Sequence, residues 1–265
     1  MNKVEQIKRI VVKIGSSTLT HESGMLNIRR VEQLVKVLAD IKNSGRELVM
    51  VSSGAGAVGF GKLGMKEKPR DMPSKQAVAA VGQCELMYTY DKMFSEFNHT
   101  TAQILLTRDV VDNADRKRNV QNTFRRLLEM GAIPIVNEND TVSTEEIEFG
   151  DNDALSAMVA VMTEADLLIV LSDIDGLYDS NPKTNPDAKL IEYVEEITDE
   201  IVLAAAGAGS NRGTGGMITK LHAAQYAGEH GIDMVILNGA NPNNLYDFLD
   251  GKKVGTYFRG KHSDT

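Results

Sequence analysis

Apolar residues are distributed along this chain in two distinct patterns, as short continuous runs and at regular spacing. Short continuous apolar runs predict strands; they lie at 10–14 (IVVKI), 47–51 (ELVMV), 103–107 (QILLT), 132–136 (AIPIV), 167–171 (LLIVL) and 234–237 (MVIL). Between the runs, apolar residues recur every three or four positions, as at 28–41, around 116–130 and at 217–230, and this spacing predicts helices. Gly45 follows the first of these helical segments, where we expect a left-handed C-cap.

The predicted strands are apolar along their whole length, which is typical of strands buried on both faces. Strands of this kind, separated by helices, indicate an α/β fold with a mainly parallel sheet covered on each side. Ligands on such sheets bind at the carboxyl ends of the strands. We therefore look for function in the loops that follow the strands, and we place a soft boundary between two lobes near Thr163.

Composition and charge narrow the class of protein. The 265 residues are 42% hydrophobic and 25% charged, as in an ordinary globular protein. A net charge of −8 argues against a nucleic-acid binder, which needs a basic face. The single cysteine, Cys84, excludes a disulfide framework, and we expect it to be buried. With no signal peptide and no apolar run of about 20 residues, we expect a cytoplasmic protein that does not enter the membrane.

A glycine-rich segment follows the run at 47–51. Gly54, Gly56 and Gly59 satisfy G-x-G-x-x-G, but a dinucleotide fingerprint should follow the first strand and precede an acidic strand end some 20 residues on. Here another strand comes first, and the segment 20 residues on has a helical pattern. We therefore favour an anion loop at a strand-to-helix junction. An NAD-dependent dehydrogenase, or glycines that only permit close packing, remain as alternatives.

Charged and polar residues gather in three other segments, two at the ends of predicted strands and one that runs into a predicted helix. Residues 13–17 (KIGSS) combine a cation with backbone N–H groups that suit a phosphate, although a solvated lysine is an equal alternative. Residues 137–140 (NEND) offer carboxylates and amides that can accept hydrogen bonds from an ammonium group, or form an Asx-rich turn. Residues 212–220 (RGTGGMITK) have the ingredients of a phosphate loop without the G-x-x-x-x-G-K-[ST] pattern, or form a surface loop.

Residues 150–153 (GDND) precede an apolar helix. One of them suits an N-cap, but capping does not explain all three polar side chains. Asp153 falls in the first turn, where a buried carboxylate can orient neighbouring lysines. Asp151 and Asp153 also permit a metal site, but no further ligands lie nearby, so we expect none held by the protein alone. The chain has neither H-E-x-x-H nor G-x-S-x-G, which disfavours zinc hydrolysis and acyl transfer.

Taken in order along the chain, these segments resemble the amino-acid kinase family. The resemblance rests on KxGSS (13–17), SSGA (52–55), NEND (137–140), GDND (150–153), SD (172–173) with GLY (176–178), and GTGGMxTK (213–220). GDND and GTGGMxTK are the specific motifs, while relatives share the two earliest more loosely. Many members carry a C-terminal PUA domain. This chain ends soon after 254–256 and resembles the short form, with one domain over 1–265.

The resemblance implies a three-layer αβα sandwich with an amino-acid lobe at about 1–163 and a nucleotide lobe at about 164–258. It implies an amino-acid site made of Ser53, Gly54, Asp140 and Asn152. It implies an ATP site made of Lys13, Gly15, Ser172, Asp173, Thr214, Gly215, Gly216, Met217, Ile218, Thr219 and Lys220. The implied catalytic residues are Lys13 and Lys220, which neutralise the transferring phosphoryl group, and Asp153, which orients both.

The activity implied by the resemblance is phosphorylation of the side-chain carboxylate of L-glutamate by ATP, the first step of proline biosynthesis. The carboxylate is already ionised, so no general base is needed, and Mg²⁺ is carried by the ATP phosphates. The resemblance also implies a homo-oligomer, feedback inhibition by proline and hand-off of the acyl phosphate to glutamyl phosphate reductase. A kinase for acetylglutamate, aspartate or carbamate, and a non-catalytic sensor, are the remaining alternatives.

Overall fold

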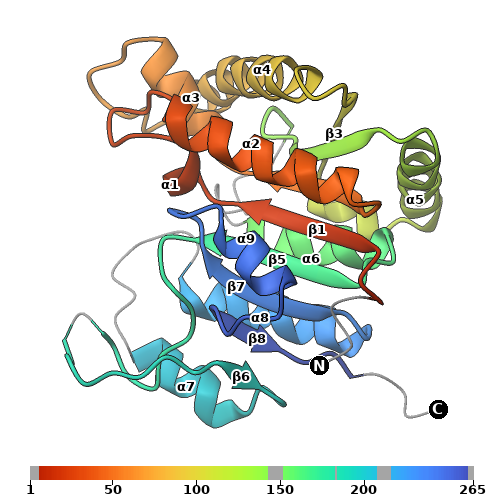
Figure 1. Ribbon diagram of the computed structural model, residues 1–265. Coiled ribbons are helices and arrows are strands. Elements are labelled where there is room, and N and C mark those ends of the chain that lie inside the picture. The colour runs from red at the N-terminus through yellow and green to blue at the C-terminus, as the bar shows by residue number, and fades with distance from the viewer. Residues whose placement is uncertain (1–5, 143–151, 183, 208–215, 262–265) are drawn as a thin grey trace.

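The computed structural model describes residues 6–142, 152–182, 184–207 and 216–261. Within them, eight strands form one sheet in the order β3-β4-β2-β1-β5-β7-β8-β6 (Figure 1). The strands are β1 (Arg9–Ile14), β2 (Glu47–Ser52), β3 (Thr101–Leu106), β4 (Ile133–Glu138), β5 (Leu167–Ser172), β6 (Tyr193–Val194), β7 (Asp233–Asn238) and β8 (Thr256–Phe258). All neighbours pair in parallel except β7 and β8. The mainly parallel sheet is confirmed.

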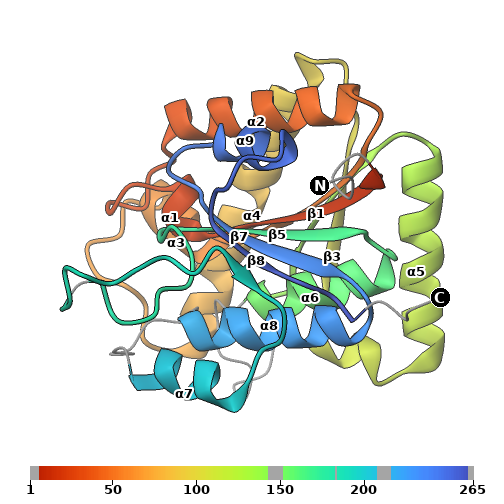
Figure 2. The same ribbon diagram turned by 60° about the horizontal axis from the view of Figure 1, so that its bottom comes forward.

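Helices cover both faces of the sheet, which confirms the three-layer arrangement (Figure 2). The helices are α1 (Ser16–Leu19), α2 (Ile28–Asn43), α3 (Ala55–Lys62), α4 (Met72–Ser95), the short 3-10 helix η2 (Arg108–Val111), α5 (Ala114–Glu129), α6 (Asn152–Met162), α7 (Asp199–Gly207), α8 (Met217–Glu229) and α9 (Asn244–Leu249). Buried side chains of α2, α3, α4 and α9 pack on one face, and those of α5, α6 and α8 pack on the other. The sheet runs through both expected lobes, and the boundary between them remains a prediction.

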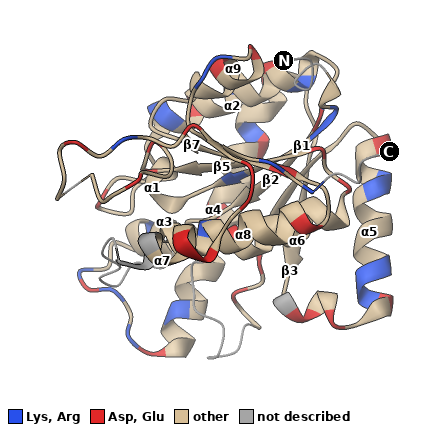
Figure 3. Cartoon of the chain, turned by 90° about the horizontal axis from the view of Figure 1, so that it is seen from below, with Lys and Arg blue, Asp and Glu red and all other residues tan. Residues whose placement is uncertain are grey.

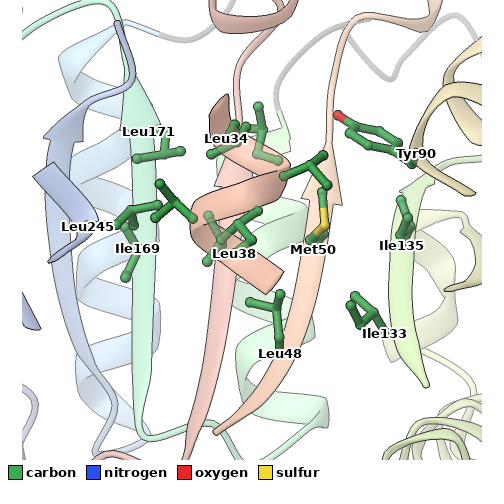
Figure 4. Close-up of a cluster of buried hydrophobic side chains, with 14 of the residues drawn as sticks. Leu34, Leu38, Leu48, Met50, Tyr90, Ile133, Ile135, Ile169, Leu171 and Leu245 are labelled. Atoms are coloured by element: carbon green, nitrogen blue, oxygen red, sulfur yellow. The ribbon is translucent and has the colours of Figure 1, made fainter. Parts of the chain in front are cut away.

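The core explains why the strands have no polar face. In β1, Ile10, Val12 and Ile14 point into one apolar cluster, while Val11 points into the other. Figure 4 shows side chains of the first cluster: Leu34 and Leu38 of α2 lie over β1, between side chains of β5 and β2, with Tyr90 of α4 at one side. Because successive side chains of a strand face opposite layers, an all-apolar strand fits only a sheet covered on both sides.

Local signals set the ends of the helices. The side chain of Asn27 accepts a hydrogen bond from the Arg30 N–H group and begins α2. Beyond the end of α2, Gly45 has φ +94°, which confirms the left-handed residue expected there. Asp71 caps α4 through the Ser74 N–H group. Of these three positions, Gly45 lies in the turn that returns the chain from α2 to β2.

The surface corrects one expectation. Cys84 is exposed on α4, so the expectation of a buried thiol is wrong. The basic residues of α5 lie on a solvated face (Figure 3), where Arg116 pairs with Asp109 and Arg126 with Glu129. None of the helices in the described residues is long and apolar enough to cross a membrane.

Candidate active site

Three buried charges meet at the carboxyl end of β1. Lys13, near the end of β1, places Nζ 2.7 Å from Oδ1 of Asp153, and Lys220, in the first turn of α8, places Nζ 3.1 Å from Oδ2. Asp153 lies in the first turn of α6 and is 0% exposed, and the two lysines are 6% and 3% exposed. The structure therefore joins the three residues predicted to be catalytic, and the alternative of a solvated Lys13 is wrong.

The charges in this trio determine its electrostatics. Burial alone would raise the pKa of Asp153, but the Lys13 and Lys220 ammonium groups, with hydrogen bonds from Lys13 and Thr219, hold that pKa below its usual range. The Thr219 hydroxyl donates to Asp153 Oδ2 at 2.8 Å. Two ammonium groups against one carboxylate leave one net positive charge. Such a centre attracts anions where water is largely excluded.

A cavity of about 670 Å³ lies at the same edge of the sheet, and Asn152, the sequence neighbour of Asp153, is part of its lining. Its lining includes all four residues predicted for the amino-acid site, namely Ser53, Gly54, Asp140 and Asn152. The Ser53 Oγ atom is buried and has no hydrogen-bond partner within the described part of the chain. A buried hydroxyl without a partner costs free energy unless a ligand or water completes its hydrogen bonds. This atom is therefore available to a ligand in the cavity.

One wall of the cavity is acidic. Glu138, at the end of β4, and Asp140, two residues further on, both line it. Burial, with the negative charge of Glu138, raises the pKa of Asp140 to about 6. Such a wall suits a cationic group, because an ammonium would relieve the repulsion between the two carboxylates. The residues 137–140 therefore form more than an Asx-rich turn.

An amide network supports this wall. Asn152 Nδ2 donates to the Ser52 carbonyl oxygen and to Asn137 Oδ1, both at 2.9 Å. Asn137 Nδ2 donates to Gln83 Oε1 of α4 at 2.8 Å. The network joins the ends of β2 and β4 to the first turn of α6 and to α4. Gln83 was not predicted from the sequence, because a single glutamine inside a helix belongs to no recognisable motif.

The glycine-rich segment lies at the edge of the cavity and in the contact between two helices. Gly54 has φ +98° at the turn between β2 and α3, and it lines the cavity. Gly59 serves packing instead, because a Cβ atom there would lie 1.9 Å from the carbonyl oxygen of Val78 in α4. The third glycine thus permits close contact between α3 and α4, and the anion loop remains a prediction.

The residues predicted for ATP lie at the same end of the sheet. Ser172 ends β5, and its hydroxyl bonds the Asp173 carboxylate at 3.2 Å. Gly216, Met217, Ile218, Thr219 and Lys220 form the start of α8. Gly15 follows β1, and a Cβ atom there would lie 3.9 Å from Lys13 Nζ. Thr214, Gly215 and Asp151 lie outside the described residues. The role of all these residues in nucleotide binding remains a prediction.

The fold and this site define an α/β protein that assembles buried cations at the carboxyl edge of a parallel sheet. Residues 8–238 match the Amino acid kinase family. The chain belongs to that family. It is 58% identical over 261 residues to the glutamate 5-kinase of Clostridium perfringens, with 97% of each chain covered. It is 51% identical to the glutamate 5-kinase of Listeria innocua, over 97% of this chain and 95% of the relative.

Solved structures with lower identity share the fold. The UMP kinase from Ureaplasma parvum matches with a TM-score of 0.67 at 19% identity, covering 96% of this chain and 99% of that one. The carbamate kinase from Giardia lamblia, bound to AMP-PNP, matches with a TM-score of 0.67 at 16% identity, again over 96% and 99%. These likenesses agree with the fold class read from the sequence.

The first prediction concerns the buried carboxylate. We expect Asp153→Asn to lower the free energy of unfolding by about 3–5 kcal/mol, because it removes the carboxylate that pairs with both buried lysines. The exposed Asp115, paired with Arg118, provides the matched control, and Asp115→Asn should change stability by about 0.5 kcal/mol or less. Urea unfolding at pH 7 measures both. Equal effects of the two substitutions would contradict the structural role of Asp153.

Proposed function

We propose that the protein transfers the γ-phosphoryl group of ATP to the side-chain carboxylate of L-glutamate. The observation that carries this proposal is the buried trio of Asp153, Lys13 and Lys220 at the same edge of the sheet as a cavity with an acidic wall. Relatives named glutamate 5-kinase, 50–58% identical over nearly the whole chain, support the choice of substrate.

The chemistry needs positioning and charge neutralisation more than proton transfer. The attacking group is a carboxylate and the group under attack carries the phosphate charges, so two anions must approach each other. In phosphoryl transfer the protein contributes mainly geometry and electrostatic stabilisation. Lys13 and Lys220 supply positive charge from two different elements, β1 and α8, and Asp153 fixes the distance between them. No general base is required of this chain.

The two substrates approach the trio from opposite sides in this proposal. Glutamate occupies the cavity, with Ser53, Gly54, Asp140 and Asn152 around it and its ammonium group on the acidic wall. ATP lies over the ends of β5 and α8, on Gly15, Ser172, Asp173 and 214–220. Mg²⁺ is carried mainly by the nucleotide phosphates, which is how this ion commonly binds in kinases. The expected proline inhibition, homo-oligomer and hand-off to glutamyl phosphate reductase remain predictions.

The experiment that tests the proposal measures ADP release from MgATP, with glutamate, N-acetylglutamate or aspartate as the acid. Hydroxylamine traps the acyl phosphate as a hydroxamate. We expect hydroxamate mainly with glutamate, because N-acetylglutamate lacks the free ammonium group that the acidic wall favours, and the side chain of aspartate is one methylene shorter between its ammonium and its side-chain carboxylate. Turnover of N-acetylglutamate as the better substrate would contradict the assigned specificity, and no turnover with any of the acids would contradict the proposed reaction.

A second prediction concerns Lys220. We expect Lys220→Ala to lower kcat by about 10²-fold or more, the scale seen when one group that stabilises transition-state charge is removed. The exposed Lys253, which pairs with Glu192 at the surface, provides a matched control. Lys253→Ala should leave kcat unchanged. A Lys220→Ala enzyme with nearly normal kcat would remove this lysine from the mechanism.

A third prediction concerns pH. The ionised form of Asp140 accepts the substrate ammonium, and its pKa is raised to about 6. The kcat/KM for glutamate should therefore fall as the pH drops through about 6, since kcat/KM reports ionisations of the free enzyme. Asp140→Asn should raise the glutamate KM and abolish this limb of the profile. The same limb persisting in Asp140→Asn would assign it to another group.

A stability measurement on Asp140→Asn distinguishes loss of a binding group from damage to the fold. The folded pKa of Asp140 is raised above the ordinary carboxyl value of about 3.9, so ionisation of Asp140 costs stability as the pH rises from about 4 through 6. Asp140→Asn removes that cost, and its Tm at pH 7 should equal or exceed that of the unchanged protein. A lower Tm would mean that loss of binding reflects misfolding.

A further inference from the structure

In the amide network behind the cavity, the donor and the acceptor of each hydrogen bond can be assigned. Asn137 Oδ1 accepts from the backbone N–H group of Glu138 at 2.9 Å, and Asn152 Nδ2 donates to the backbone carbonyl of Ser52 at 2.9 Å. A backbone N–H group can only donate and a carbonyl oxygen can only accept. These two contacts therefore determine which atom of each side-chain amide is oxygen and which is nitrogen.

This assignment determines which atom of the Asn152 side chain is available to a ligand. An amide nitrogen has two hydrogens, and those of Asn152 are taken by Ser52 and Asn137. Within the described residues, Asn152 Oδ1 has no hydrogen-bond partner, and Asn152 lines the cavity. The ligand therefore meets an acceptor at this position. Together with Glu138 and Asp140, it completes a wall of acceptors, which fits the ammonium group of an amino acid.

We propose that Gln83 is a positioning residue that orients this acceptor for the substrate ammonium, a proposal that rests on the function given above. Gln83 Oε1 accepts from Asn137 Nδ2 at 2.8 Å. That contact holds the nitrogen of the Asn137 amide, while Asn152 contacts its oxygen. Without it, a donor of the buried Asn137 loses its partner, and the amide that holds Asn152 in place is less constrained.

The packing of α4 allows Gln83 to reach the network. Its neighbour Gly82 lies so close to α3 that a Cβ atom there would be 1.8 Å from the Ala55 carbonyl oxygen. Two turns further along, the wholly buried Tyr90 places its hydroxyl 2.9 Å from Ser52 Oγ. Figure 4 shows this hydroxyl directed toward β2. α4 is thus fixed on both sides of Gln83, which makes its side chain a rigid support.

The test compares Gln83→Met, which removes the acceptor at similar size, with Gln83→Glu, which keeps it. We expect Gln83→Met to raise the glutamate KM about 5- to 10-fold, the scale of one net hydrogen bond. The kcat and the KM for ATP should change little, the Tm should fall by only about 2–4 °C for each kcal/mol lost at Asn137, and Gln83→Glu should restore most of the glutamate affinity. Gln121, a half-buried glutamine of α5 away from the cavity, is the matched control. Gln121→Met should leave all four quantities unchanged.

Glutarate has the same two carboxylates as glutamate but no amine. It therefore tests whether Gln83→Met weakens the contact with the substrate ammonium. We expect Gln83→Met to leave the kcat/KM for glutarate within about twofold, while that for glutamate falls about 5- to 10-fold. Equal losses for both substrates would overturn the inference. So would an unchanged glutamate KM, or a fall in Tm, kcat and both affinities that Gln83→Glu does not rescue. Failure of the unchanged protein to phosphorylate glutamate would instead refute the proposed function.

Discussion

The arrangement of this site depends on one buried carboxylate shared by two lysines. Lys13, Asp153 and Lys220 are far apart in the sequence, and each would be costly to bury alone. Burial is tolerated only when all three meet, so β1, α6 and α8 must end at one place. The trio adds little to net stability, because desolvation offsets most of its attraction. What it provides is a definite geometry for positive charge at the edge of the sheet.

The sheet topology makes this meeting possible. β1 lies between β2 and β5, and the sheet continues beyond β2 to β4 and β3 on one side and beyond β5 to β7 on the other. Crossovers on opposite sides of β1 open a crevice at its carboxyl end, where ligands of parallel sheets bind. The β2 and β4 loops supply the acidic, amide-rich side. The β5 end and α8 supply the side proposed for the nucleotide. Lys13 stands between the two.

Much of this organisation could be predicted from the sequence, because burial on both faces produces continuous apolar runs and the chemistry follows them. The short β6 and β8 were not predicted, since two or three residues show no periodicity. Cys84 was wrongly expected to be buried because its neighbours are small or apolar, yet its own position on α4 faces outward. The burial of Lys13 was undecided, because it depends on Asp153, which lies 140 positions away. Gln83 was missed because its role depends on packing between helices.

The first turn of α6 connects the two halves of the site. Asn152 and Asp153 are consecutive, and neighbouring residues on a helix point about 100° apart. Asn152 faces the amides behind the cavity, while Asp153 faces the lysines. Neutral amides can orient an acceptor for an ammonium group without adding negative charge beside the lysines. The positive centre and the acidic wall thus stay separate although one helical turn holds both, and an amino acid spanning them would present its side-chain carboxylate to the lysines.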